Sequence, residues 1–362
     1  MTEINVDSDD LVEIIDLSDD THSEDDDIQV EDLSKGPEEP EDAHSLDNGP
    51  NNPNTDGNVI LTSTEEQVYD RQIRLWGLKA QERIMKSHVL FLGKNGIQEE
   101  AMKNLLLAGM TISLINDHIV TSDDVKLSFF LKDEDIYKYH SEALCNRMSY
   151  MTTKKDRING TVSKFLNEDS DGNYQVESLD ALKKFNVLCI SAEDYPLHKL
   201  ERVNEVCRTL EIAFFVSMSC GIYGYFFMDL QNHTVEELFN KNAKSLTIEY
   251  RKLSDVFNQV RFPKGCNPVI KSIFGLVSCI KMGKTQDEMD DLCKRICGEI
   301  GADISTTTSM IQMHGQGFPV TSSILGGYLA LEVRKYVTKQ HETIPNFCAF
   351  DMDTSTVATA ML

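Results

Sequence analysis

The sequence predicts an α/β protein: a Rossmann-like, doubly wound sheet with a helical insert, preceded by a disordered acidic tail. Two observations lead to this prediction. Residues 1–58 contain 20 Asp or Glu and one basic residue, Lys35, so they carry −19 of the total formal charge of −24. Beyond them, strand-like apolar runs alternate with helix-like stretches, which is the pattern that βαβ units produce. We therefore expect a tail at 1–58 and one folded domain at 59–362.

The tail consists mainly of Asp, Glu, Ser, Asn and Pro, and it contains no aromatic residue. Such a segment buries too little apolar surface to offset the entropy of ordering, so we expect disorder. Within it, Val12, Ile14, Ile15 and Leu17 form an aliphatic run among acids, which resembles a SUMO-interacting motif. A run of this kind suits addition to the edge of a partner's sheet beside basic side chains. The alternative is a chance cluster.

The first half of the domain opens with helices and continues with a βαβ unit. Residues 64–86 place apolar residues at helical spacing with a break at Gly77, which predicts two short helices. The apolar run at 89–92 ends at Gly93 and predicts a buried strand followed by a tight turn. The helix and the strand that complete the unit are expected at 98–108 and 111–115.

The second half continues the alternation of strands and helices. The expected strands lie at 187–191, 213–218 and 347–350, and the expected helices at 197–210 and 319–337. Residues 232–310 show few strand signals and a Pro/Gly break at 263–268. We therefore expect this region to be a largely helical insert.

Composition argues against several classes of protein. The acidic balance opposes nucleic-acid binding, which needs clustered Lys and Arg. The sequence contains no run of about 18 apolar residues, so we expect no membrane span. The first residues lack the basic start and apolar core of a signal peptide. The nine cysteines include no CxxC pair, so we expect reduced thiols and no metal site. Cys293 and Cys297 have the spacing to share a helix face.

The most informative string is YDRQIRLWG at Tyr69–Gly77. One interpretation is an amphipathic surface helix with Ile73 and Trp76 packed inward. The string also resembles the opening signature of the ubiquitin-activating superfamily, which includes ThiF and MoeB. Further stretches that match this superfamily are KNLLLAG at 103–109 and the late helix at 318–332.

The resemblance covers nearly all of residues 64–362 and implies the adenylation fold of that superfamily. In the superfamily, the arginine that matches Arg71 reaches across a dimer interface to the triphosphate held by the other half. The resemblance therefore implies that Arg71 serves a partner's ATP site in trans. A guanidinium suits this task because its planar donors match phosphate oxygens and it stays charged. Arg74 is a weaker candidate, for which we expect a surface or interface salt bridge.

The resemblance breaks down where the superfamily binds its nucleotide. An active member has a Gly-rich turn between the first strand and helix, because backbone amides and the helix N-terminus must approach the phosphates closely. Here the turn reads GKNGIQ from Gly93, and two of the superfamily's glycines fall on Asn95 and Gln98. Their side chains would occupy phosphate space or require an unfavourable φ.

Other nucleotide-binding positions are also changed. The superfamily's Asn-Arg-Gln falls on residues 126–128, so its phosphate-gripping arginine becomes Leu127. Its lysine falls near Glu142, and its magnesium-positioning aspartate falls on either Asp194 or Tyr195. Loss of these cations weakens the binding of a polyphosphate. We therefore expect this chain alone to be inactive and to bind neither ATP nor magnesium.

Length and layout resemble the smaller, non-catalytic subunit of SUMO-activating enzymes. This implies a heterodimer with a larger catalytic subunit, which binds ATP and magnesium and carries the catalytic cysteine. Residues 220–318 are too short for a full cysteine domain, and no sequence cue marks a reactive thiol there. The resemblance also implies SUMO as a partner, no nucleic-acid or membrane partner, and a nuclear location, with the cytoplasm as the alternative.

Four other functions stay open on the sequence alone. They are the equivalent subunit of the neddylation-activating enzyme, a homodimeric ThiF/MoeB-like enzyme acting alone, a non-enzymatic SUMO-binding scaffold with a dead adenylation fold, and an NAD-dependent dehydrogenase. The second and fourth require an intact glycine turn after the first strand, which this sequence lacks.

Overall fold

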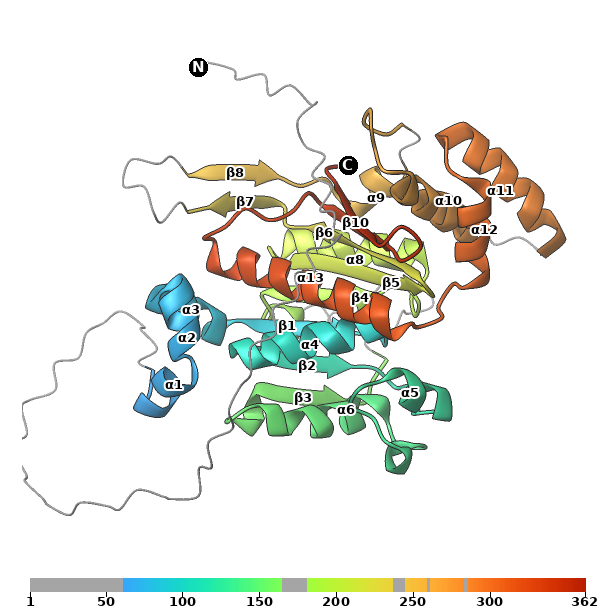
Figure 1. The fold of residues 1–362 in the computed structure, drawn as a ribbon. Coiled ribbons are helices and arrows are strands. Elements are labelled where there is room, and N and C mark those ends of the chain that lie inside the picture. Colours follow the sequence, from blue (N-terminus) through green and yellow to red (C-terminus); the bar gives the residue numbers. More distant parts are fainter. Residues whose placement is uncertain (1–60, 165–180, 237–244, 259–260, 283–285) are drawn as a thin grey trace, which may run out of the picture.

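The structure is a computed structural model and is drawn in Figure 1. The residues that it describes are 61–164, 181–236, 245–258, 261–282 and 286–362. They make up most of the domain expected at 59–362. The expected tail, with Val12, Ile14, Ile15 and Leu17, lies outside the described residues.

An eight-stranded mixed sheet forms the centre of the body, with the strand order β10-β9-β6-β5-β4-β1-β2-β3. The strands are β1 (His88–Leu92), β2 (Thr111–Ile115), β3 (Ile158–Thr161), β4 (Val187–Ser191), β5 (Ala213–Cys220), β6 (Tyr223–Asp229), β9 (Phe347–Asp351) and β10 (Thr356–Ala360). The five strands from β5 to β3 are parallel, whereas β6, β9 and β10 join them antiparallel. The chain winds outward from β1 to β3 and then returns to β4 on the other side of β1. This reversal creates a crevice at the carboxyl ends of β1 and β4.

The predicted doubly wound sheet is confirmed, including the strands expected at 89–92 and 187–191. Three strands of this sheet were not predicted from the sequence: β3, β6 and β10. β6 follows β5 after a turn of only two residues, so the sequence reads as one long apolar stretch with no marked boundary. β3 has four residues and too little alternation to indicate a strand.

Both faces of the sheet are buried, which explains why β1 is apolar throughout. Val89 and Phe91 belong to one core, and Leu90 and Leu92 belong to the other. Helices α4 (Gly96–Ala108), α6 (His140–Met148) and α13 (Pro319–Thr338) contribute to the first core. Helices α8 (Leu197–Thr209), α9 (Leu253–Phe257) and α10 (Pro268–Met282) contribute to the second. A parallel strand covered on both faces has no solvent side and therefore no polar alternation.

Three helices precede β1, where the sequence predicted two. They are α1 (Ser63–Val68), α2 (Asp70–Trp76) and α3 (Leu78–Lys86). The predicted break at Gly77 is confirmed, and its φ of +84° suits a glycine. A second break lies at Tyr69, whose ring is buried with Leu61 and Met85. Figure 1 shows all three helices beside the amino-terminal end of β1.

The region 232–310 opens with a small sheet that the prediction of a largely helical insert missed. Strands β7 (Asn232–Val235) and β8 (Leu246–Glu249) pair antiparallel. Each has four residues, which is too short for a clear period in the sequence. Helices α9 and α10 follow, and then α11 (Gln286–Ile300) and α12 (Ile304–Gln312), so the rest of the region is helical as predicted. No helix within the described ranges is both long and apolar enough to cross a membrane.

Helices α4 and α13 lie side by side on the sheet (Figure 1), and a glycine allows their close approach. A Cβ on Gly326 would lie 2.7 Å from the carbonyl oxygen of Ile97 and 2.6 Å from the Cβ of Glu100. A Cβ on the neighbouring Gly327 would meet no other atom within 4 Å. Thus one glycine of this pair is required by packing and the other is not.

Gly326→Ala should therefore lower the free energy of unfolding by about 1–3 kcal/mol, because α13 must move away from α4. The matched control is Gly327→Ala, which should raise it by about 0.5–1 kcal/mol through helix propensity. Urea unfolding of the isolated chain, followed by circular dichroism, measures both. Equal destabilisation by the two substitutions would contradict this packing.

Candidate functional site

The crevice at the carboxyl ends of β1 and β4 holds a pocket of about 520 Å³. Its walls are the turn after β1, the helix α5 (Ser122–Leu127) and the segment that leads into α13. This is where a doubly wound sheet binds its ligand, because the strand order reverses there. Of the residues that the sequence assigned to the superfamily's nucleotide site, Asn95 and residues 126–128 line this pocket, whereas Gln98, Glu142, Asp194 and Tyr195 do not.

Asn95 occupies the N-terminus of α4. Its Oδ1 accepts a hydrogen bond of 2.8 Å from the backbone N–H of Gln98, and its Nδ2 donates to the hydroxyl of Ser217 at 3.1 Å. The backbone of Asn95 is extended, with φ of −158°. The predicted unfavourable φ is therefore not found at this residue, and its side chain caps the helix. The amide side chain takes a place at which helix N-termini otherwise bind anions.

Gln98 is turned inward beneath the same turn. Its side chain is buried, and its Nε2 donates to the carbonyl oxygens of Leu92 at 3.2 Å and Cys189 at 3.4 Å. Leu92 is the last residue of β1, and Cys189 is the middle residue of β4. Gln98 therefore connects α4 to the sheet. The expectation that its side chain would project into the pocket is wrong.

Of the two positions that the sequence left open, Asp194 lies against the turn. Its carboxylate accepts a hydrogen bond from the backbone N–H of Lys94, and a Cβ on Gly93 would collide with its Oδ2. Its Oδ1 lies 2.9 Å from Nε2 of His118, and this hydrogen bond raises the pKa of His118. Asp194 and Tyr195 both line a separate pocket of about 260 Å³.

A buried polar chain runs behind the turn. Asn116 donates from Nδ2 to the carbonyl oxygen of Gly93 at 3.0 Å and to Nδ1 of His140 at 3.2 Å. Because Nδ1 accepts, the ring proton of His140 lies on Nε2 and points to Glu99 at 3.2 Å. The other carboxylate oxygen of Glu99 accepts from the hydroxyl of Ser128 at 2.6 Å. This chain holds β1, β2, α4 and α6 together, and it leaves the amide of Asn116 no free donor for a ligand.

The charges around the pocket oppose a polyphosphate. Two ammonium groups, those of Lys94 and Lys126, face four carboxylates, and both are already paired with carboxylates of α5. The carboxylates belong to Glu99, Asp123, Asp124 and Glu193. Leu127 lines the same pocket and brings no charge. A tetra-anion placed here would meet net negative charge and no free cation among the described residues.

Glu142 was expected near the nucleotide site, and the structure places it elsewhere. It lies on the first turn of α6 and lines a different groove, beside β3. Within the described ranges, no group of three or more His, Cys, Asp or Glu side chains could hold a metal ion.

The cysteines are packing residues. All nine are free thiols, and all except Cys266 are buried. Burial raises the pKa of Cys145 and Cys279 to about 12 and that of Cys297 to about 11. Such thiols are poor nucleophiles at neutral pH. Cys293 and Cys297 do share a face of α11, as their spacing predicted, with 3.8 Å between the sulfur atoms.

Arg71 lies at the opposite end of the sheet from this pocket. It is exposed on α2, which precedes the amino-terminal end of β1, whereas the turn follows the carboxyl end (Figure 1). No hydrogen bond or ion pair engages Arg71 within the part of the chain that the structure describes. Arg74, one turn later, pairs with Asp70 at 3.0 Å. The two arginines therefore differ: Arg74 has an internal partner and Arg71 has a free guanidinium.

Several contacts fix the position of helix α2, which carries Arg71. Trp76 packs against the first core, as predicted, and the guanidinium of Arg334 lies 4.7 Å from the centre of its ring. Gln340 donates to the carbonyl oxygen of Trp76 at 2.8 Å, and Gln72 donates to that of Leu107 at 3.3 Å. Arg334 and Gln340 were not identified from the sequence, because their contact with Trp76 joins segments about 260 residues apart.

Exposed apolar side chains lie on α2, which carries Arg71, and on the helices that contact it. They belong to α1, α2, α3 and the end of α4, and they are Val68, Leu75, Leu78 and Leu107. Leu75 is the most exposed of them, at 75%. Such a group, adjacent to an unpaired cation, is typical of a protein–protein interface.

Comparison with known proteins gives consistent results. The ThiF family profile matches residues 69–362. The SUMO-activating enzyme subunit 1B-1 of Arabidopsis thaliana is 30% identical over 322 residues, which cover 81% of this chain and 94% of that protein. The SUMO-activating enzyme subunit 1 of Dictyostelium discoideum is 33% identical over 187 residues, so the match spans about half of each chain, 51% and 52%.

The solved structures give a likeness in fold alone. The structure of Escherichia coli MccB with MccA-N7isoASN has a TM-score of 0.51 and 14% identity, and the match covers 81% of this chain and 71% of that one. At this identity the match supports the arrangement of the sheet and helices and says nothing of the site.

Glu193 makes the pocket sensitive to pH. Its Oε1 accepts a hydrogen bond of 2.8 Å from the backbone N–H of Ser219, and burial raises the pKa of its carboxyl from 4.5 to about 7. Ionisation in the folded state therefore costs free energy. This cost is absent below about pH 4.5, grows up to about pH 7 and is complete above it.

Glu193→Gln should therefore raise the free energy of unfolding by about 1–3 kcal/mol at pH 8 and have little effect at pH 5. Urea unfolding at both pH values measures the difference. The matched control is Glu142→Gln on the exposed side of α6, for which a change within about 0.5 kcal/mol is expected at both. A Glu193 effect independent of pH would contradict the raised pKa.

Proposed function

The chain belongs to the ThiF family, and on that premise we propose that it is the non-catalytic subunit of a heterodimeric SUMO-activating enzyme. One observation carries the proposal: the free guanidinium of Arg71 lies at the far end of the sheet from a pocket that lacks the charges for ATP. An arginine so placed serves another chain's site more readily than its own. The relatives named as subunit 1 of SUMO-activating enzymes support the choice of modifier.

In this proposal the larger partner subunit binds ATP and magnesium, and this chain binds neither. Asn95 caps α4, Leu127 brings no cation, and Lys94 and Lys126 are paired with acids. The side chains that line this pocket therefore do not offer the free positive charge that a nucleoside triphosphate needs. Calorimetric titration of the isolated chain with MgATP separates this proposal from a homodimeric enzyme, because binding with a micromolar Kd would favour the latter.

The reaction that Arg71 would assist is the adenylation of a modifier's carboxyl terminus. The carboxylate attacks the α-phosphorus of ATP, a bond forms to carboxylate oxygen, and pyrophosphate leaves with the electron pair of the broken P–O bond. Negative charge builds on the phosphate oxygens during this step. A guanidinium held beside them stabilises that charge without losing its proton. The contacts of Gln72, Trp76 and Gln340 would fix the position of α2 for this purpose.

The partner would seat on the exposed apolar side chains around Arg71, namely Val68, Leu75, Leu78 and Leu107. Association would then cover these side chains and carry Arg71 into the partner's site in one step. Desolvation at such an interface strengthens the contact between a guanidinium and a phosphate.

A nuclear location follows only from the proposed place in sumoylation, and it is part of the same proposal. Two rivals predict different outcomes on purification. The equivalent subunit of the neddylation-activating enzyme would support transfer of that modifier and not of SUMO. A SUMO-binding scaffold would be a stable monomer that is dispensable for SUMO activation.

Arg71→Ala should slow formation of the SUMO adenylate by roughly 10²–10⁴-fold, because the triphosphate loses a cation supplied in trans. The heterodimer should still form, since Arg71 holds no other described part of the chain in place. Pyrophosphate exchange by the purified heterodimer measures the rate, and size exclusion checks assembly. The matched control is Arg74→Ala on the same helix, expected to change the rate by less than about threefold. Wild-type exchange by the Arg71 variant would refute the assignment.

The tail should bind SUMO weakly through the aliphatic run at residues 12–17. Titration of isotope-labelled SUMO with the full-length chain should shift resonances along one sheet edge. Ile14→Asp combined with Ile15→Asp should abolish those shifts, because a charge cannot replace an aliphatic contact in the edge groove. Shifts that persist in the double variant would assign SUMO binding to another part of the chain.

A further inference from the structure

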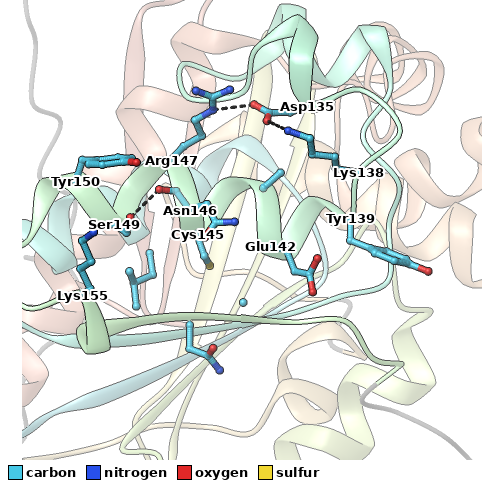
Figure 2. A pocket seen from close by; sticks show the side chains of 14 residues that line it. Asp135, Lys138, Tyr139, Glu142, Cys145, Asn146, Arg147, Ser149, Tyr150 and Lys155 are labelled. Carbon is cyan, nitrogen blue, oxygen red and sulfur yellow. Dashed lines mark hydrogen bonds and ion pairs between the residues drawn. The ribbon is translucent and has the colours of Figure 1, made fainter.

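A second groove, larger than the pocket at the turn, lies between α6 and β3. Its volume is about 920 Å³. Figure 2 shows it from close by, with the helix on one side and the strand on the other. Arg147, Asn146 and Glu142 extend from the helix, and Tyr150 and Lys155 stand at one end. None of the proposed SUMO-activation chemistry uses this groove.

The strand in this groove is an edge of the sheet. Among the described strands, β3 is last in the order and pairs only with β2. The carbonyl oxygen of Thr161 accepts from the N–H of Asn116 at 3.3 Å, on the β2 side. Because alternate residues of a strand turn their N–H and C=O to opposite edges, those of Ile158 and Gly160 point toward the groove. These backbone groups are what an added strand pairs with.

Gly160 makes this edge accessible alongside the helix. A Cβ there would collide with the carbonyl oxygen of Ser141, so β3 passes directly beneath α6. Gly160 itself is half-buried, so its backbone stays partly open to solvent at this edge. A groove walled by an edge strand and a helix is the geometry of domains that bind extended peptides by β-augmentation.

The walls of the groove suit a segment that is both aliphatic and acidic. Tyr139 and Tyr150 are exposed by 43% and 83% and offer apolar surface. The ammonium of Lys155 lies 5.7 Å from the ring centre of Tyr150. The apolar and the cationic surfaces therefore lie together at the end of the groove that Tyr150 and Lys155 form (Figure 2).

The groove is locally cationic in an acidic protein. The charged side chains that line it are Lys138, Arg147 and Lys155 against Asp135 and Glu142, a net charge of +1 where the whole chain carries −24. Arg147 also pairs with Glu134 beside the groove, so Lys155 is the lining cation that has no ion pair among the described residues. Asp135 is buried and held by Arg147 at 2.8 Å and Lys138 at 3.1 Å. The pocket at the turn, with four carboxylates and two ammonium groups, has the opposite sign. An acidic peptide would therefore favour the groove.

The acidic tail enters the folded body beside this groove. Glu65, on the first described helix, contacts Lys154 at 2.6 Å and Arg157 at 3.6 Å. Residues 154–157 lead directly into β3, and Lys155 among them lines the groove. Between Leu17 and Leu61 there are 43 residues. A flexible chain of that length has a root-mean-square span of roughly 35 Å, which is sufficient to reach any point of the groove.

We propose that the groove between α6 and β3 binds the chain's own aliphatic segment, residues 12–17, as an added strand on β3. Its acids, Glu13 and Asp16, then lie near Lys138 and Lys155, and its aliphatic side chains pack against the tyrosines. Docking covers the same residues that would bind SUMO, so the two partners exclude each other. The groove then competes with SUMO for residues 12–17. Docking in the groove does not itself depend on the tail binding SUMO.

Hydrogen exchange of the full-length protein tests this docking. The amides of Ile158 and Gly160 should exchange about tenfold or more faster in a double variant, Ile14→Asp with Ile15→Asp, than in the wild type, because the added strand is lost. The matched control is Ile28→Asp, which places the same change in the same tail outside the segment and should leave exchange unaltered. Equal exchange in all three proteins would overturn the proposal.

Two further measurements identify the occupant. Lys155→Glu should quicken exchange at residues 12–17 as well as at β3, since it reverses the charge of the groove. Exchange at β3 in the wild type should be independent of protein concentration. Protection that is lost on dilution would overturn the proposal in favour of a second copy of the chain. Protection of residues 12–17 that survives Lys155→Glu unchanged would place the segment on another surface.

Discussion

Side-chain hydrogen bonds to both ends of α4 are the constraint on which the rest of this structure depends. At the N-terminus, Asn95 accepts from the N–H of Gln98. At the C-terminus, Gln72 donates to the carbonyl of Leu107 and Gln81 to that of Ala108. A helix end otherwise leaves such groups free for water or a ligand. Here one end is closed to anions, and the other end anchors the helix that displays Arg71.

The two ends of the chain's parallel sheet consequently differ in chemistry. At the carboxyl end, the carboxylates that surround the pocket leave no free cation among the described residues. At the amino end, Arg71 is exposed among apolar side chains. The chain keeps the fold of its family, and its exposed Arg71 lies at the opposite end of the sheet from the acidic pocket.

Much of this could be read from the sequence where one residue or a local pattern carries the signal. The strand before Gly93 was predicted because burial on both faces makes a parallel strand uniformly apolar. The loss of a nucleotide site was predicted from Asn95 and Leu127, each of which changes the chemistry by itself. Gln98 was misjudged because its side chain turns toward the carbonyl oxygens of Leu92 and Cys189, and the second of these lies 91 residues away in the sequence. Glu142 was misplaced for a related reason, since only the packing of α6 on β3 decides which groove it faces.

By itself, the sequence determined the acidic composition of residues 1–58, the alternation that builds the doubly wound sheet and the break at Gly77. These follow from composition, period and the conformational range of single residues. Only the tertiary structure decided which strand is the edge, which carbonyls Gln72 and Gln340 bind, and that Arg71 faces away from its own pocket. Each of these depends on contacts between distant segments, and such contacts leave no local pattern because almost any polar residue can make them once the fold brings it there.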